Sequence, residues 1–331
     1  MSGFIKISGI GAYLPEQKVL SDDLMMEANS KNFGVAPEFL RRFSGIEERR
    51  FSREDERPST MAIEASRAAI VDAGIDVKDI DQVIFCGIDK DFAEPATAHF
   101  VARELGIKEE ADCFDVSNAC HGIMSGFSVA NGAIGIGAAE NILLCTGENP
   151  STVAMDVIRQ LKGCRDRGQF RTLMGAMTLG DSGGAFVVSK ARPDEGCKIM
   201  RFTSRSRCAD YCYYRHTEHG VDFSMRMSEI STEAVQMHRD IIGSTYDKIE
   251  WEPDSISYVY CHQAGAKPHI KMAQLARQPI NKAPITFKKF GNLTSSTIAV
   301  NMHLNRPNRG DRILMLGVGS GLSISQTACV Y

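Results

Sequence analysis

The chain contains 331 residues, of which 43% are hydrophobic and 24% are charged, and its formal net charge is −3. This length accommodates one large domain or two fused domains of about 100–200 residues each. The composition is typical of a globular chain with a sizeable core, and the small net charge gives no indication of nucleic-acid binding or of an anionic membrane surface. No apolar run approaches the roughly 18 residues that span a bilayer.

The ten cysteines indicate a reduced environment. None forms a C-x-x-C pair, and Cys86 and Cys145 lie in apolar runs, where cysteine behaves as a small hydrophobic residue. This usage differs from the disulfide framework of a secreted domain. The first residues lack the charged and apolar regions of a signal peptide. The sequence therefore predicts a cytoplasmic protein without a leader.

Apolar, strand-like runs alternate with helical patterns through the first half of the chain. A helix is predicted over residues 59–73, with Ser59 as its N-cap and Gly74 as its stop. Helices are also predicted over 96–106 and 121–137, and strands over 4–14, 81–89, 112–117 and 141–148. This alternation predicts an α/β fold with mostly parallel strands that are covered on both faces.

The second half repeats the scheme after a polar, irregular region at 192–222, which is the best candidate for a linker or for a loop over an active site. Two halves are therefore expected, over 1–200 and 201–331. Helices are predicted over 228–249, 267–277 and 292–305, and strands over 255–263 and 311–321.

A weak internal duplication relates the two halves. In the first, a strand-like CFDV precedes Cys120, a helix of small residues and a strand that starts at Asn141. In the second, a strand-like PITF precedes Asn292, a Ser/Thr/Ala helix and a strand that starts at Asp311. The spacings are 141 − 120 = 21 and 311 − 292 = 19 residues. Halves packed about a pseudo-twofold axis would bring Cys120 and Asn292 face to face.

Cys120 is the candidate nucleophile, since it follows a predicted strand and opens a helix in DVSNACHGIMSG. Free N–H groups and the partial positive charge at a helix start lower the pKa of a thiol, and the thiolate is the nucleophilic form. The same N–H groups can form an oxyanion hole. The local sequence is equally compatible with Cys120 as one more buried cysteine.

Two further candidates accompany Cys120. His262 ends an apolar strand in SYVYCHQAGAKPH, where open α/β sheets place ligands, although an isolated histidine there is more often bonded to backbone. Asn292 follows Gly291 in KKFGNLTSST, which alone is also a common turn and helix cap. Together the three fit acyl transfer: Cys120 carries an acyl thioester, and His262 and Asn292 hydrogen-bond the thioester oxygen of a second substrate, stabilising its enolate.

These motifs resemble β-ketoacyl-acyl carrier protein synthase III and its relatives in the thiolase superfamily. The resemblance covers nearly the whole chain and includes FSGIEERRF, DVSNACHG, LGDSGGAFVV, CHQAGAKPH, FGNLTSST and GVGSGLSIS in order. It implies a thiolase-like fold with duplicated βαβ halves packed as a five-layer α-β-α-β-α sandwich, a homodimer, and no metal or other cofactor. It also implies catalytic roles for Cys120, His262 and Asn292, and an oxyanion-hole loop at Gly319 and Gly321.

Several positions depart from the family pattern. Phe39 and Phe43 replace the Trp and Arg that contact the CoA adenine in the enzymes that start from acetyl-CoA, and Glu94 replaces an aromatic gate before Pro95. Gly265 replaces the usual Asn after His-Gln-Ala, Lys267 lies near the usual Arg, and His121 stands where the family often has Ala or Gly. These departures indicate a non-standard primer, in secondary metabolism, on CoA or on a carrier protein.

Other features carry weaker signals. Lys267, Lys271 and Arg277 fall on roughly one side of a predicted helix, which suits docking of an acidic carrier protein but also an ordinary solvated face. Cys208, Cys212, His216 and His219 have a spacing unlike the common zinc patterns, so no metal is expected. Methionines at 155, 172–177 and 225 are compatible with an acyl tunnel and, more simply, with core packing.

The leading prediction is a decarboxylating Claisen condensation between an acyl group on Cys120 and a malonyl or β-keto acyl thioester. One alternative is acyl transfer to an oxygen or nitrogen acceptor, with His262 as general base. Another is a non-catalytic partner subunit of a condensing heterodimer. The presence of Asn292 favours condensation over acyl transfer to an oxygen or nitrogen acceptor. The presence of Cys120, His262 and Asn292 together argues against a non-catalytic subunit.

Overall fold

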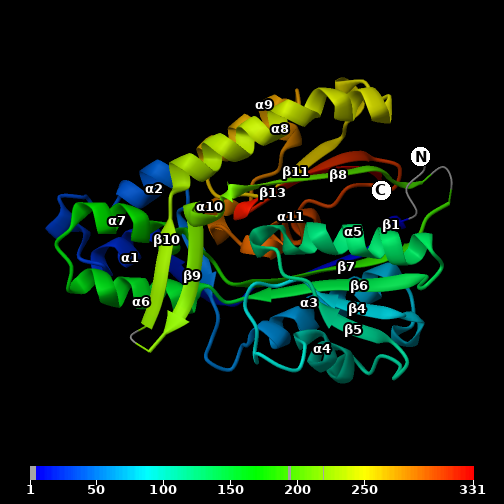
Figure 1. Ribbon diagram of the computed structural model, residues 1–331, viewed down its shortest axis with the longest axis horizontal. Coiled ribbons are helices and arrows are strands. Elements are labelled where there is room, and N and C mark those ends of the chain that lie inside the picture. The colour runs from blue at the N-terminus through cyan, green and yellow to red at the C-terminus, as the bar shows by residue number, and fades with distance from the viewer. Residues whose placement is uncertain (1–4, 193–194, 219) are drawn as a thin grey trace.

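The computed structural model describes residues 5–192, 195–218 and 220–331. Two β-sheets alternate with three layers of helices in the order α-β-α-β-α, from the bottom to the top of Figure 1. The predicted five-layer α/β sandwich is therefore confirmed.

The first sheet has the strand order β1-β7-β6-β4-β5. Its strands are β1 (Ile5–Tyr13), β4 (Gln82–Phe85), β5 (Asp112–Asp115), β6 (Asn141–Glu148) and β7 (Ser182–Lys190). Helices α3 (Pro58–Ala73) and α4 (Thr97–Leu105) cover its outer face, where alanines of α3 pack on Val83, Phe85 and Val187. Gly9 and Gly11 of β1 let α3 approach closely, because an added Cβ would lie 2.1 and 1.9 Å from backbone oxygens of that helix.

The second sheet has the order β11-β12-β13-β8. Its strands are β8 (Gly196–Cys208), β11 (Tyr258–Cys261), β12 (Arg312–Gly319) and β13 (Gly321–Val330). Helices α8 (Met227–Ile249) and α9 (Ala266–Leu275) cover its outer face. The apolar side chains of Val235, Met272 and Leu316 belong to the core between these helices and the sheet.

The middle layer consists of α5 (Gly122–Gly135) and α11 (Thr297–Leu304), which lie between the two sheets (Figure 1). The sequence of α5, GIMSGFSVANGAIG, contains no charged residue, and Ile123, Met124 and Phe127 are buried between the sheets. A helix that is enclosed on both sides cannot carry a charged face without unpaired buried charge. The small-residue composition of these helices therefore reflects their position.

The prediction of mostly parallel strands is wrong. β7 is antiparallel to both β1 and β6, and β13 is antiparallel to both β12 and β8. Parallel pairing joins β4 to β5 and β6, and β11 to β12. β12 and β13 form a hairpin at Ser320, and a hairpin necessarily pairs its strands in opposite directions.

The predicted duplication holds at the turns but not at every strand. A 3-10 turn leads into a middle helix at both sites, at Ala119–His121 before α5 and at Thr294–Ser296 before α11. The strand-like PITF, residues 284–287, is not a strand. Residues 284–286 are irregular, and Phe287 begins the short helix α10 (Phe287–Phe290). The two halves therefore share their helix and following strand, while the entry to Asn292 differs from the entry to Cys120.

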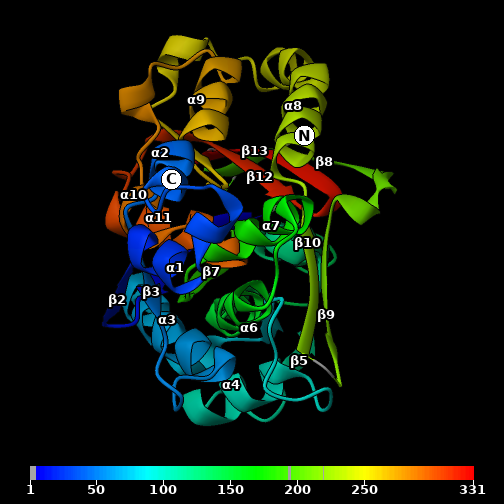
Figure 2. The same cartoon turned by 90° about the vertical axis from the view of Figure 1, so that its left-hand side faces the viewer.

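The region at 192–222 is built into the fold rather than forming a plain linker. β8 is the edge strand of the second sheet, and the predicted boundary at 200/201 falls inside it. The hairpin β9 (Cys212–Thr217) and β10 (Gly220–Met225) then runs along the side of the molecule (Figures 1 and 2). Val221 and Phe223 pack into an apolar cluster with α1 (Ser21–Glu27), α6 (Ser151–Lys162) and α7 (Arg167–Leu173).

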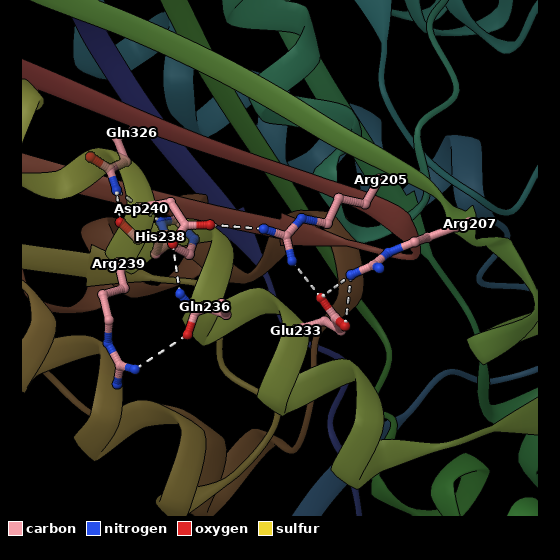
Figure 3. Close-up of polar contacts among 8 residues, drawn as sticks. All are labelled: Arg205, Arg207, Glu233, Gln236, His238, Arg239, Asp240 and Gln326. Carbon is pink, nitrogen blue, oxygen red and sulfur yellow. Dashed lines mark hydrogen bonds and ion pairs between the residues drawn. The ribbon is translucent and has the colours of Figure 1, made fainter.

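Ion pairs fasten α8 to the edge strand β8 (Figure 3). Arg205 contacts Glu233 at 2.6 Å and Asp240 at 2.8 Å, and Arg207 contacts Glu233 at 3.1 Å. Charged side chains also discourage a sheet edge from pairing with another chain. Within the described part of the chain, no helix is long and apolar enough to cross a membrane.

Candidate active site

A cavity of about 270 Å³ lies where the ends of both sheets meet the middle helices. Cys120, His262 and Asn292 all line it, so the structure brings the three predicted catalytic residues together. Gly319 and Ser320 of the β12–β13 turn also line the cavity, whereas Gly321 is not among its lining residues. The loop predicted to assist an oxyanion hole therefore contributes to the wall through its first two residues.

Cys120 lies in a strained turn between β5 and α5. The preceding residue, Ala119, has a positive φ of 47°, which is unusual for a residue with a side chain. Gly122 starts α5 at a point where an added Cβ would lie 2.0 Å from the carbonyl oxygen of Cys86. Ser295 holds the same helix start, because its hydroxyl accepts from the Ile123 N–H and donates to the Cys86 carbonyl, both at 3.0 Å.

The thiol of Cys120 differs from the sequence-based expectation. Burial raises its pKa, with further increases from Cys212 and from the carboxyl of Glu148. A helix start was predicted to lower the pKa of this thiol, but burial raises the pKa by more. The thiolate would lose its hydration and gain too few hydrogen bonds from the turn to compensate. The Cys120 side chain is therefore a thiol at rest, and it would need a base to take its proton before it could act as a nucleophile.

Two buried carboxyl groups lie close enough to Cys120 to influence its charge. Glu148 accepts hydrogen bonds from the Ile88 N–H at 3.2 Å and from the Thr146 hydroxyl at 2.8 Å. Asp89 accepts from the Tyr214 hydroxyl on β9. Burial raises the pKa of both carboxyls, and a negative Asp89 raises that of Glu148 further. This pair of carboxyl groups was not predicted from the sequence, because Asp89 and Glu148 lie far apart along the chain.

His262 follows the last residue of β11, and its N–H donates to the carbonyl of Leu316 on β12 at 3.0 Å. Burial lowers the pKa of His262 to about 4, and the backbone of Thr294 offsets part of this decrease. The imidazole is therefore neutral at physiological pH. A neutral imidazole can accept the proton of Cys120 or donate a hydrogen bond to a substrate oxygen.

Asn292 is almost fully buried, and its backbone pairs with the segment before β7. Its N–H donates to the Thr178 carbonyl at 2.9 Å, and its carbonyl accepts from the Gly180 N–H at 3.0 Å. Arg49 holds that segment by donating to the Met177 carbonyl at 2.6 Å. The side-chain oxygen of Asn292 accepts a hydrogen bond from the Thr294 N–H at 3.0 Å. Its NH₂ group is therefore the end of the amide that can donate a hydrogen bond to a ligand in the cavity.

The mouth of the cavity carries aromatic and basic side chains. Phe43, in α2 (Phe39–Ser44), and Lys267 and Lys271, in α9, line it together with Gly265. The Lys267 ammonium lies 5.8 Å from the centre of the Phe43 ring. Gly265 has a φ of 138°, and an added Cβ would lie 2.9 Å from the Ser44 carbonyl oxygen. Phe39 is exposed beside the mouth and stacks on Phe43 at 5.7 Å.

Two predicted binding residues lie apart from this cavity. Glu94 is exposed and is not among the lining residues. Arg277 follows the end of α9, where the backbone turns with a φ of 53°, and its guanidinium stacks on Tyr246 at 5.5 Å. The helix predicted over 267–277 therefore ends two residues earlier than expected, at Leu275.

Sequence reasoning missed most of the wall contributed by the β9–β10 hairpin. Cys212 and Met225 pair across its base and line the cavity. Of the methionines predicted to be compatible with an acyl tunnel, Met225 lines the cavity, whereas Met174 and Met177 are buried in the neighbouring apolar cluster. Among the described residues no three His, Cys, Asp or Glu side chains form a group that could hold a metal, and His219 lies outside those residues.

Known proteins resemble this chain along most of its length. A family model described as 3-oxoacyl-[acyl-carrier-protein (ACP)] synthase III matches residues 114–207, and the model of its C-terminal part matches residues 246–331. β-Ketoacyl-[acyl-carrier-protein] synthase III 1 of Bacillus anthracis is 30% identical over 327 residues, covering 96% of both chains. The corresponding enzyme of Neisseria gonorrhoeae is 25% identical over 335 residues, covering 97% of both.

Solved structures with the same fold include OleA of Xanthomonas campestris. One OleA structure with bound lauric acid and lauroyl-CoA has a TM-score of 0.91 and 22% sequence identity, and all of both chains is covered. A cerulenin-bound OleA structure also has a TM-score of 0.91.

Proposed function

Because the chain belongs to the 3-oxoacyl-[acyl-carrier-protein] synthase III family, we propose that it is a condensing enzyme that loads an acyl group on Cys120 and extends it with a malonyl thioester. The observation that supports this proposal best is that Cys120, His262 and Asn292 line one cavity with a basic mouth. In this proposal Cys120 is the nucleophile, His262 transfers a proton and donates a hydrogen bond, and Asn292 donates a second hydrogen bond.

In the first half-reaction the Cys120 sulfur attacks the carbonyl carbon of an acyl thioester. The neutral His262 takes the thiol proton, and that proton leaves with the departing thiolate as a free thiol. The raised pKa of the Cys120 thiol means that a base is needed, and the lowered pKa of His262 keeps its imidazole neutral with a free lone pair, so we place the proton transfer in the same step as attack on the acyl carbon. Backbone N–H groups at the turn before α5 are suited to the oxyanion that forms in between.

In the second half-reaction His262 and Asn292 donate hydrogen bonds to the thioester oxygen of the malonyl unit. Loss of carbon dioxide leaves an enolate, whose negative charge these two donors stabilise. The enolate carbon attacks the acyl group on Cys120, forming a carbon–carbon bond and releasing the cysteine. The Asn292 amide is held for this task by its bond from Thr294.

The acyl and malonyl groups are proposed to arrive on CoA or on an acyl carrier protein. Lys267 and Lys271 at the mouth suit the phosphate groups that both carriers bear, and Phe39 and Phe43 offer apolar ring faces. The altered residues at this mouth support a primer other than acetyl-CoA, with use in secondary metabolism as part of the proposal. The halves 1–200 and 201–331 would then carry the nucleophile and the two hydrogen-bond donors, respectively.

A cytoplasmic homodimer completes the proposal. β5 is the edge strand of the first sheet, so one of its sides is free to pair with a second copy. Cys120 comes five residues after the end of this strand, and a dimer formed there would support the strained turn that positions the nucleophile.

The test is to incubate the purified protein with a panel of acyl-CoA and acyl-carrier thioesters and then with a malonyl thioester. We expect acylation of Cys120 in intact and peptide mass spectra, followed by release of carbon dioxide and a β-ketoacyl product. Replacement of Cys120 by Ala should abolish acylation. Acylation without carbon dioxide release would favour transfer to another acceptor, and normal acylation of the C120A variant would contradict the assignment of the nucleophile.

A further inference from the structure

A fully buried arginine, Arg49, contacts the segment that pairs with the proposed catalytic asparagine. It belongs to the short strand β3 (Glu48–Phe51; Figure 2) and has no exposed surface. Its Nη2 donates to the Met177 carbonyl at 2.6 Å and to the Ser21 hydroxyl at 2.9 Å, and its Nη1 donates to the Val19 carbonyl at 3.2 Å. The guanidinium therefore joins the start of α1 to the segment that precedes β7.

The Met177 carbonyl belongs to the same short segment that holds the backbone of Asn292. The Asn292 N–H donates to the Thr178 carbonyl at 2.9 Å, and its own carbonyl accepts from the Gly180 N–H at 3.0 Å. The two parts of the chain form an isolated parallel bridge at this point. Because Thr178 directly follows Met177, an unbroken path of bonds runs from the Arg49 guanidinium to the Asn292 backbone.

The stem of Arg49 also packs against the two glycines that border this bridge. An added Cβ would lie 3.0 Å from the Arg49 Cβ at Gly180 and 3.2 Å from it at Gly291. Gly291 has a φ of 72°, and its added Cβ would lie 2.6 Å from the Thr178 carbonyl oxygen. The backbone on both sides of the bridge thus lies directly on Arg49, which leaves Asn292 little room to shift.

The charge of Arg49 has no carboxylate partner among the described residues. Its acceptors are two carbonyls and a hydroxyl, and its Nε has no partner in that part of the chain. Burial lowers the pKa of Arg49 to about 10, so the guanidinium stays cationic at physiological pH. Desolvation of a buried charge costs free energy that neutral acceptors return only in part. The arrangement suits stability poorly, whereas the rigid guanidinium fork holds its acceptors at set positions.

The proposed condensation depends on where the NH₂ group of Asn292 lies. A donor stabilises a developing oxyanion when it is about 2.7–3.1 Å from that oxygen, and a displacement of about 1 Å can cost on the order of 100-fold in rate. The Thr294 N–H orients the Asn292 side chain at 3.0 Å, but only the bridge fixes its backbone to the segment before β7. Acylation of Cys120 does not use Asn292 in the proposed mechanism.

We propose that Arg49 is a positioning residue for the condensation step. By holding the segment 177–180, it sets the position of the Asn292 amide that stabilises the enolate. Arg49 is not among the residues that line the cavity, so it acts through Asn292 and not on the substrate. This inference rests on the proposed function and deepens it, because it assigns Arg49 to the second half-reaction alone.

Replacement of Arg49 by Met or Lys tests this role. Arg49→Met keeps an unbranched stem and removes every donor, whereas Arg49→Lys retains a cation and part of the hydrogen bonding. Acylation of Cys120 and carbon dioxide release from a malonyl thioester are measured separately. In Arg49→Met we expect acylation within about threefold of the wild type and condensation at least about tenfold slower. Arg49→Lys should recover part of the condensation rate.

A double-variant cycle with Asn292→Ala distinguishes positioning from a general structural role. If Arg49 acts through Asn292, adding Arg49→Met to Asn292→Ala should slow the residual condensation by less than about twofold. Ser21→Ala removes one acceptor of the guanidinium and leaves Arg49 in place. It should produce a smaller loss that is again confined to condensation, and it decides the matter if Arg49→Met does not fold.

Hydrogen exchange supplies a readout that is independent of activity. The amides of Gly180 and Asn292 are the donors of the bridge, so peptides that contain them should exchange at least about tenfold faster in Arg49→Met than in the wild type. Ile7→Ala is the matched control, because Ile7 is 1% exposed but pairs with Val188, far along β7 from this segment. It should destabilise the protein and leave the ratio of the two half-reactions unchanged.

Three results would each overturn the positioning role of Arg49. These are equal slowing of both half-reactions, a fully additive loss in the double variant, and unchanged exchange at Gly180 and Asn292 in the Arg49 variants. Absence of carbon dioxide release from the wild type would instead overturn the proposed function. The exchange rates would then still decide whether Arg49 holds Asn292 in place.

Discussion

The backbone N–H of Thr294 donates a 3.0 Å hydrogen bond to the side-chain oxygen of Asn292, and this bond determines which end of the Asn292 amide is available to a substrate. Asn292 lines the cavity with Cys120 and His262, so it presents a donor rather than an acceptor to the cavity. The polarity of this one group distinguishes an enolate-stabilising site from a simple acyl-transfer site.

Replacement of Asn292 by Asp should separate the two half-reactions. The carboxylate can still accept from Thr294, but its second oxygen repels the enolate instead of donating to it. We expect malonyl decarboxylation to fall by at least about 100-fold while acylation of Cys120 stays near the wild-type rate. Carbon dioxide release and intact mass measure the two steps. Asn305→Asp makes the same change at the far end of α11 and should leave both rates unaltered; equal loss of both steps in N292D would contradict this role.

The pH dependence of Cys120 alkylation tests the electrostatics of the nucleophile. Burial raises the pKa of its thiol, so the thiolate fraction should still increase throughout the range from pH 6.5 to 9. We expect the rate constant for iodoacetamide to rise by up to about tenfold per pH unit in that range, since only the thiolate reacts. Peptide mass spectrometry resolves Cys120 from the other cysteines. A plateau below pH 8 would show that the helix start dominates after all.

The sequence was sufficient to predict those site residues whose positions depend on where strands end and helices begin. Cys120, His262 and Asn292 each fall at the end of a strand or the start of a helix, and such positions can be located from apolar periodicity and turn residues. The α/β class followed from the alternation of elements, and the resemblance of the motifs to the family implied the five-layer sandwich. The strand directions did not, because periodicity describes which faces are buried and not how strands pair.

The contribution of the 192–222 region could not be predicted for a similar reason. Cys212 reaches the cavity only because the β9–β10 hairpin folds back along α6 and α7, and that packing depends on the apolar cluster around Phe223. The raised pKa of Cys120 also depends on long-range neighbours, since Glu148 comes from a different strand. Polar composition alone described the same region as a linker.

Charge at the cavity mouth should affect substrate binding more than chemistry. Lys267→Gln and Lys271→Gln each remove a cation from the lining, so we expect KM for a phosphate-bearing thioester to rise about threefold to tenfold, with kcat nearly unchanged. Raising the salt concentration should reduce the difference from the wild type. Arg277→Gln is the control, because Arg277 lies outside the cavity over Tyr246. An equal KM effect of Arg277→Gln would show that only overall charge matters.

Three histidines with strongly lowered pKa values should make the protein sensitive to acid. Burial lowers the pKa to about 4 for His121 and His262 and to about 3 for His238, compared with 6.5 in the unfolded chain. Neutral imidazole is thus favoured in the folded state, so the stabilisation is complete above pH 6.5 and is lost as the pH falls toward 4. Each histidine should account for about 2 kcal/mol of unfolding free energy lost between pH 7.5 and 5.

Replacement of His238 by Gln isolates one of these contributions. Gln cannot be protonated and can still bond to Gln326, so the variant should lose about 2 kcal/mol less than the wild type over the same pH interval. Urea unfolding at pH 7.5 and pH 5 measures the difference. His99→Gln is the control, because His99 is exposed on α4 and should leave the pH dependence as it is. Parallel pH profiles for the wild type and the His238 variant would mean that His238 already carries its charge in the folded protein.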